Sequence, residues 1–159
     1  MRAAISMIFM AFIIASCSGG VPGISFVKNS YSSGYAVSKS EGSMNSSVII
    51  PATNENLPVI EIRDHAFDGC FNLTNIIMPN TVRIIGDAAF RGTSLRSVNL
   101  PNSITTIGNY AFANTYIESI VIPDSVTSIG YDAFKNCVNL KSVSIPIGIK
   151  HFGSFVFSG

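Results

Sequence analysis

The side chains best suited to catalysis or metal binding are few in this sequence, which has three cysteines and two histidines among 159 residues. Zinc sites and nucleophilic sites both need such residues at short, regular spacings or beside a base. His65 and His151 are far apart and occupy different positions in the local pattern around them. The sequence also lacks Gly-x-Ser-x-Gly, phosphate-binding-loop and paired-carboxylate motifs. It therefore predicts a protein that is not an enzyme and that needs no metal or cofactor.

The first cysteine follows an export signal. Residues 1–16 begin with Met-Arg and continue with a short apolar run, which is typical of a secretory signal peptide. The run ends in Ile14-Ala15-Ser16-Cys17, which resembles the lipobox of bacterial lipoproteins, although Leu is more common than Ile at the first position. The resemblance implies removal of residues 1–16, acylation of Cys17, and an exported protein anchored in a bacterial membrane, at the outer membrane or cell surface. The alternative is an ordinary signal peptide with an incidental cysteine.

Composition limits the class of partner. The formal net charge is +1, only 12% of residues are charged, and lysine and arginine do not cluster. Nucleic-acid-binding proteins depend on a basic surface, so we expect no nucleic-acid partner. After residue 16 no apolar run approaches the roughly 20 residues of a membrane-spanning helix. Membrane attachment is therefore expected through the lipid anchor.

The elements that must position any functional residue are repeats of 22 or 23 residues. A fixed period in the twenties predicts a solenoid, in which each coil buries its apolar face against its neighbours. We interpret residues 48–159 as this solenoid, which ends in mid-repeat, and its phenylalanines as a stacked structural column. The recurring residues are Pro79, Pro101, Pro123 and Pro146; Gly86, Gly108, Gly130 and Gly153; and Phe67, Phe90, Phe112, Phe134 and Phe157.

Each repeat predicts the same succession of elements. Alternation such as Val98-Asn99-Leu100 predicts a strand with one buried face, paired in parallel with the next coil and ended by the proline. The glycine predicts a close backbone approach or a positive φ. Because Arg63 stands at this position in the first coil, that coil is expected to bend differently. Residues 87–90 predict a short helical turn on the opposite side of the coil.

Two runs carry a family resemblance: Ile-Pro-Asp-Ser-Val-Thr-Ser-Ile-Gly-Tyr-Asp-Ala-Phe-Lys-Asn-Cys at residues 122–137, and Leu-Pro-Asn-Ser-Ile-Thr-Thr-Ile-Gly-Asn-Tyr-Ala-Phe at residues 100–112. They resemble the BspA-type leucine-rich repeat over about residues 48–159. The resemblance implies an α/β repeat solenoid of leucine-rich-repeat coils, with a parallel β-sheet on the concave face and short helical turns on the convex side. It also implies a bacterial surface protein that binds host extracellular or cell-surface proteins, and it carries no catalytic residues.

Strand alternation selects the candidate protein-binding residues, which are expected to point outward from the sheet. We expect a protein ligand, either a host extracellular protein or an envelope protein. The alternative is an internal envelope scaffold or a truncated remnant without an external ligand. The candidates form two columns: Asn75, Ser97, Ser119 and Ser142 in one, and Ile77, Asn99, Val121 and Ser144 in the other.

The remaining segments receive simpler predictions. Residues 17–23 carry the lipidated cysteine and a flexible Gly-rich tether, and residues 24–47 predict a β-hairpin that covers the first coil, with a disordered segment as the alternative. Cys70 and Cys137 occupy the same repeat position three coils apart. At ~4.8 Å per strand they lie roughly 14 Å apart, beyond the ~7 Å Cα limit for a mutual disulfide. Both are interpreted as small, buried apolar residues.

Overall fold

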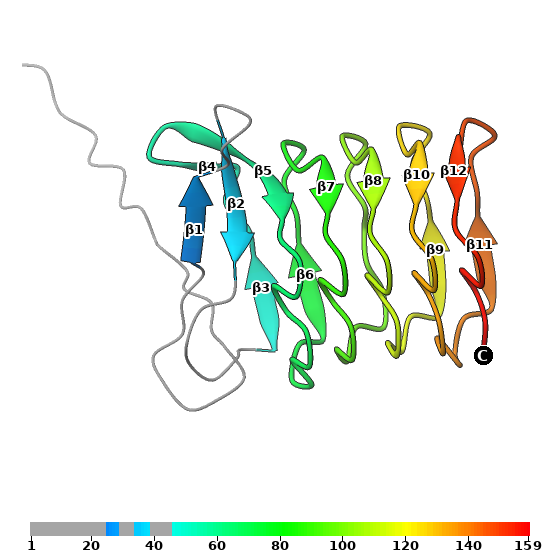
Figure 1. The fold of residues 1–159 in the computed structure, drawn as a ribbon. Helices are drawn as coiled ribbons and strands as arrows, with labels where there is room; N and C mark the ends of the chain where they lie inside the picture. Colours follow the sequence, from blue (N-terminus) through cyan, green and yellow to red (C-terminus); the bar gives the residue numbers. More distant parts are fainter. Residues whose placement is uncertain (1–24, 29–33, 39–45) are drawn as a thin grey trace, which may run out of the picture.

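The computed structural model describes residues 25–28, 34–38 and 46–159. Short β-strands and turns form coils that stack side by side along one axis, with β1 and β2 at one end and β12 at the other (Figure 1). The predicted signal peptide, Cys17 and the tether lie outside the described residues. Within the described residues no helix is long and apolar enough to cross a membrane.

One long sheet runs through the stack in the order β1-β2-β5-β7-β8-β10-β12, with β4 on the side of β5. The β1–β2 and β4–β5 pairs are antiparallel, and the other neighbours are parallel. A hairpin, β1–β2, thus precedes the coils and joins their sheet through β2. The strands are β1 (Ser25–Lys28), β2 (Tyr35–Ser38), β4 (Thr53–Asn54), β5 (Leu57–Ile62), β7 (Ile84–Ile85), β8 (Thr106–Ile107), β10 (Ser128–Ile129) and β12 (His151–Phe152).

From β7 onward this sheet lies directly before the recurring glycines, where the sequence pattern predicted no strand. The glycine that follows each of these short strands allows the coils to approach closely, because a Cβ on Gly130 would lie 2.4 Å from the Asn109 nitrogen. The backbone N–H of Gly130 donates to the carbonyl of Ile107 in the preceding coil at 2.8 Å. Of the two reasons considered for the glycines in the repeats, close approach is therefore the one that applies, since Gly86, Gly108, Gly130 and Gly153 have no positive φ.

The prediction that Arg63 makes the first coil bend differently is wrong. His65, two residues later, has a φ of 56°, close to the 50° of the equivalent Ala88. The same tight turn also follows both positions. In the later coils a glycine is needed because the backbone of the preceding coil lies against it. The neighbour of Arg63 on that side is instead β2, where the Val37 carbonyl accepts a hydrogen bond from the Arg63 N–H at 2.9 Å. The arginine side chain is exposed and has room.

Four strands carry or adjoin the predicted binding residues: β3 (Ser47–Ile49), β6 (Asn75–Ile77), β9 (Ser119–Val121) and β11 (Ser142–Ser144). They pair in parallel as β3–β6 and β9–β11. Residues 97–99 are not a strand, so the expected continuous sheet with one strand per coil is interrupted in the coil between the two pairs. The outward and inward alternation is kept, with Ile76 and Ile120 buried between exposed neighbours.

The predicted helical turns are also wrong, and no helix occurs in the described part of the chain. In the coil that contains residues 86–93, three overlapping turns replace the helix, closed by bonds from Ala89, Arg91 and Thr93 to the carbonyls three residues earlier. Ala88 has a φ of 50°, which an α-helix does not contain. The N–H groups between these turns donate to the next coil, as Phe90 does to Ala111 at 2.8 Å. Backbone donors that a helix would use internally thus hold the coils together.

The phenylalanines predicted to stack form a continuous column inside these turns. Neighbouring ring centroids lie 5.2 to 5.4 Å apart with interplanar angles of 4 to 16°. The column lies within a core of aliphatic side chains from every coil. Phe90, Phe112 and Phe134 are among the largest fully buried side chains, while Phe157 is partly exposed. The column consists of Phe67, Phe90, Phe112, Phe134 and Phe157.

Candidate protein-binding face

The candidate binding face consists of the eight predicted side chains, and the structure leaves all of them exposed. Strand register brings members of different coils side by side, because Ser119 pairs with Ser142 and Val121 pairs with Ser144. Two columns of side chains therefore run along the stack. The exposed members are Asn75, Ile77, Ser97, Asn99, Ser119, Val121, Ser142 and Ser144.

Sequence reasoning missed the first member of each column. Ser47 pairs with Asn75, and Ile49 pairs with Ile77. The side-chain amide of Asn75 donates to the Ser47 hydroxyl at 3.0 Å. The similarity between residues 48–50 and 76–78 was a signal for this extension, since it already aligned the two strands.

The chemistry of the face is polar with exposed aliphatic positions. Ile77 is 52% exposed and Val121 is 69% exposed, so each offers apolar surface to a partner. A row of charged side chains borders the face. In this row the Glu118 carboxylate lies 3.8 Å from the Arg96 guanidinium and 3.7 Å from the Lys141 ammonium group. These pairs are solvent-exposed and add little stability. Such a surface suits contact with another protein better than recognition of a highly charged polymer.

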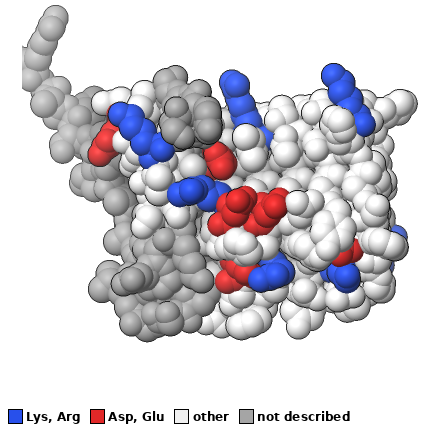
Figure 2. Space-filling view, viewed as in Figure 1, with Lys and Arg blue, Asp and Glu red and all other residues white. Residues whose placement is uncertain are grey.

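The side of the molecule seen in Figure 1 has no continuous basic surface in its described part. Acidic and basic side chains are interspersed there, and most of that surface is uncharged (Figure 2). On the turns, Asp68 accepts two hydrogen bonds from the Arg91 guanidinium, at 2.9 and 2.6 Å. The ring of His65 lies 2.9 Å from the same carboxylate. His151 is on β12, several coils away, and no metal-binding group of three or more His, Cys, Asp or Glu residues occurs among the residues described.

The Asp68 contacts make stability depend on pH. Burial alone would raise the pKa of Asp68, but the hydrogen bonds from Arg91 and His65 outweigh it, so that the pKa is lowered. A carboxyl group with a lowered folded-state pKa stabilises the fold above its unfolded pKa, and this contribution is lost as the pH falls through the folded pKa. At pH 7 Asp68→Asn should therefore reduce the free energy of unfolding by about 1 kcal/mol or less, because Arg91 is partly exposed.

Urea unfolding at several pH values measures this effect. The difference between the wild-type protein and Asp68→Asn should shrink as the pH falls below about 3.9, the pKa of an unperturbed aspartate. It should also shrink at high salt, which screens the Arg91 interaction. A difference that stays constant down to pH 2 would show that the carboxylate charge does not matter.

The two cysteines of the coils are both buried. Cys70 is disulfide-bonded, so the interpretation of both as small apolar residues is wrong for Cys70. Cys137 is a free thiol whose sulfur lies 3.2 Å from the Phe112 carbonyl and 3.3 Å from the Thr115 hydroxyl. Burial raises the pKa of the Cys137 thiol, although the contacts with Thr115 oppose this. A buried thiol with a raised pKa contains little of the nucleophilic thiolate, which fits a core residue better than a reactive one.

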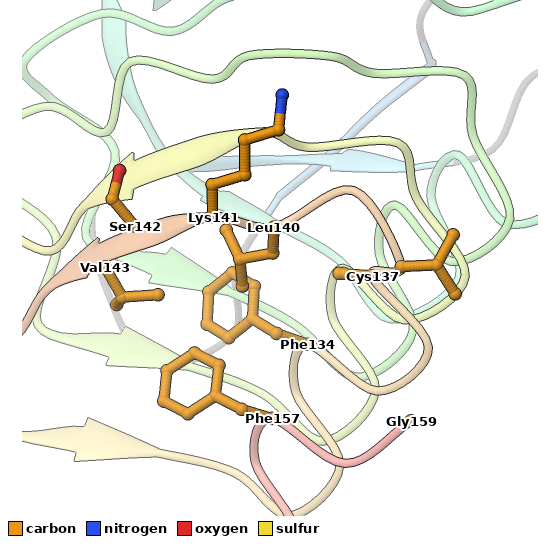
Figure 3. Close-up of a pocket in the computed structure, with 9 residues that line it drawn as sticks. Phe134, Cys137, Leu140, Lys141, Ser142, Val143, Phe157 and Gly159 are labelled. Carbon is orange, nitrogen blue, oxygen red and sulfur yellow. The ribbon is translucent and has the colours of Figure 1, made fainter.

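A cavity of about 250 Å³ lies beside the phenylalanine column in the last coils. Figure 3 shows the rings of Phe134 and Phe157 at its centre with Leu140 directed toward them. Val143 lines another part of the wall, and the lining contains no aspartate, glutamate or histidine side chain. The cavity therefore exposes core side chains and does not assemble an acid–base pair.

Comparison with known proteins agrees with the architecture. A family model for the BspA type leucine-rich repeat region matches residues 59–159 in six copies. A comparison with curated protein sequences gives no significant match. Among solved structures, the chain is similar to a leucine-rich repeat protein of T. pallidum, at 31% identity and a TM-score of 0.80, covering 85% of this chain and 64% of that one.

Two further solved structures share the fold. One is a leucine-rich repeat protein from Bacteroides ovatus, at 28% identity and a TM-score of 0.65, covering 86% of this chain and 43% of that one. The other is a leucine-rich cell surface protein from Faecalibacterium prausnitzii, at 23% identity and a TM-score of 0.56, covering 86% and 44%. The chain thus spans less than two thirds of the length of each of these relatives. With six matched repeats and a parallel β-solenoid, this chain belongs to the BspA-type leucine-rich repeat family.

Proposed function

We propose that this protein is a lipid-anchored module of a bacterial cell envelope that binds another protein through the candidate binding face. The observation that carries the proposal is the alignment of eight exposed side chains in two columns. Buried isoleucines hold the strands that carry them, as Ile76 does in β6 and Ile120 in β9. Solenoids generally use such extended surfaces for protein contacts.

The anchoring part of the proposal is supported by residues 14–17, which resemble a lipobox, and by the apolar segment before them. Two acyl chains on Cys17 would hold the protein stably at a membrane, because each buried methylene contributes about 0.8 kcal/mol. The tether at residues 18–23 would give the coils freedom to meet a partner. The envelope location and the protein ligand are thus two parts of one proposal, each with its own test.

Substitution at the centre of the face tests the binding part. We expect Ser119→Arg to weaken binding to an interacting protein at least tenfold, because a long charged side chain would project between the two columns. Binding is measured by surface plasmon resonance of the full chain in lipid nanodiscs against a panel of purified extracellular-matrix and cell-surface proteins. Tenfold corresponds to about 1.4 kcal/mol.

Ser154→Arg is the matched control, since Ser154 is exposed but lies in the turns and outside the face. If both variants bind like the wild-type protein, the face is not the binding site. If no member of a broad panel binds the folded protein, an internal envelope scaffold becomes the better account.

The anchoring part is tested in intact bacterial cells. An epitope tag within residues 18–23 reports cleavage by added protease, and Cys17→Ser removes the proposed acylation site. We expect the wild-type protein to fractionate with membranes and the variant to leave them. Cleavage of the coils without lysis would place them on the cell surface, whereas protection until the envelope is opened would place them inside it.

A further inference from the structure

A second cavity, of about 430 Å³, lies where β9 and β11 end, directly beside the candidate binding face. Val121 and Ser144 belong to both the face and the lining. Beyond them the wall is formed mainly by aliphatic side chains and two prolines. The lining residues are Asn102, Val121, Ile122, Pro123, Asp124, Ser144, Ile145, Pro146 and Ile147.

The last coil departs from the repeat at this cavity. The position after the strand-ending proline is polar in the three preceding coils, where Asn80, Asn102 and Asp124 occupy it, but it is Ile147 in the last coil. The Ile147 side chain is fully exposed. Ile147 groups with exposed Val121 and Ile145 at the same cavity, and exposed apolar side chains that form one patch indicate a contact, whereas single ones do not.

The next residue departs from the repeat as well. In the two preceding coils a serine hydroxyl donates to the carbonyl of the coil before, as Ser125 does to Ile104 at 2.6 Å. The last coil has Gly148 instead, which makes no such bond. An added Cβ at Gly148 would have its nearest neighbour at 3.9 Å, the carbonyl oxygen of Asp124. The turn is therefore open as well as apolar.

The shape and chemistry of the cavity select its occupant. Val121, Ile145 and Ile147 surround the opening with exposed aliphatic surface. Pro123 and Pro146 stiffen the wall, because proline restricts its own backbone. A concave site that combines exposed aliphatic side chains with polar groups can hold a bulky apolar side chain and hydrogen-bond the segment that carries it.

Charge adds a second requirement. Asp124 is the only charged residue of the lining, and none of the ion pairs in the described part of the chain includes it. A cation on the partner would complement this exposed carboxylate and also help to orient the segment. The polar side chains of Asn102 and Ser144 are available on the same wall for hydrogen bonds to the partner.

We propose that this cavity binds a bulky apolar side chain of an extended partner segment, with a neighbouring lysine or arginine of that segment against Asp124. The inference rests on the proposed function, because it places an anchoring residue of the same interface at one end of the face. The expected partner segment is therefore hydrophobic and basic at this end, whereas the two columns of the face carry no charged side chain that would select a charged partner.

Photo-crosslinking tests this assignment with a defined probe. The peptide Gly-Ser-photoleucine-Lys-Ser-Gly is irradiated with the full chain in phosphatidylcholine nanodiscs, and mass spectrometry maps the labelled residues. We expect labels on the segments that contain Val121 and residues 145–147. A peptide with Glu in place of Lys should label at least fivefold less, because its charge repels Asp124.

The variants copy residues that other coils already hold at the same position, so the fold should tolerate them. Ile147→Asn and Asp124→Asn should each reduce labelling at least fivefold, the first by removing apolar surface and the second by removing the charge. Phe71→Asn is the control, since Phe71 is exposed but lies outside the cavity. Circular dichroism verifies that each variant is folded.

Three results would overturn the inference: labelling no higher than that of unlinked photoleucine, labelling elsewhere, or equal labelling of wild-type protein and Ile147→Asn. Labels confined to the columns around Ser97 and Ser119 would refute the cavity while supporting the face. Loss of partner binding in Ser119→Arg with unchanged cavity labelling would show that the face and the cavity act separately. The two proposals therefore fail in distinguishable ways.

Discussion

Phe112→Ala should lower the free energy of unfolding by about 3–5 kcal/mol, the cost typical of removing a fully buried phenylalanine. The ring is inaccessible to solvent and stacks on Phe90 and Phe134, with centroids 5.2 and 5.3 Å away. Hydrogen bonds between coils fix their spacing on both sides of the column, so the cavity left by the ring cannot close easily. For a small protein this loss is a large part of the total stability.

Urea unfolding followed by circular dichroism measures the loss, with Phe157→Ala as the matched control. Phe157 occupies the same repeat position but is 37% exposed and stacks on Phe134 alone among the column members. Its truncation should cost clearly less. Equal losses at the two positions would show that the column does not act through burial.

Gly130→Ala should prevent stable folding, although it adds only one methyl group. That Cβ would lie 2.4 Å from the Asn109 nitrogen and 2.5 Å from the Gly108 carbonyl carbon. Both are backbone atoms of the preceding coil, so no side-chain rotation can relieve the clash. Moving the coils apart would break the bond from Gly130 to Ile107 and the β8–β10 pairing. We expect a loss above about 4 kcal/mol, in the range reached by few single substitutions.

Gly148→Ala is the control for this prediction, because its Cβ would have 3.9 Å to the nearest atom. This variant should be as soluble as the wild-type protein and have the same free energy of unfolding to within about 0.5 kcal/mol. Thermal and urea unfolding of both variants provide the comparison. A folded Gly130→Ala protein with wild-type stability would mean that the coils are not held as closely as the structure shows.

The coil period could be predicted from sequence because identical contacts recur at fixed intervals. Phe67 to Phe157 and the glycines mark the positions where one coil meets the next. The long sheet could not be located, since strands such as β7 (Ile84–Ile85) are too short to show alternation. The helical turns were predicted from residues 87–90, whose local preference for a helix is overridden when the next coil supplies acceptors for their N–H groups.

The candidate binding face was easier to predict from the sequence than the cavity beside it. Alternation around Ile120 is a local pattern, so the outward direction of Ser119 and Val121 follows from it. The cavity depends on the approach of two coils and on the departure of Ile147 from its equivalents. A single substitution in one coil becomes informative only when its neighbours in space are known. The ligand also depends on the chemistry of a second molecule, which this chain does not encode.

Backbone hydrogen bonds join each coil to the next both in the sheet and in the turns. In the sheet, Gly130 of the later coil donates to Ile107 of the earlier one, whereas in the turns Phe112 of the earlier coil donates to Ala133 of the later one. Each coil therefore offers the next coil the same two edges of backbone donors and acceptors, one in the sheet and one in the turns. Duplication of one complete repeat would recreate both edges without any new contact, so an array of this kind can lengthen by tandem duplication and gain binding surface in fixed increments.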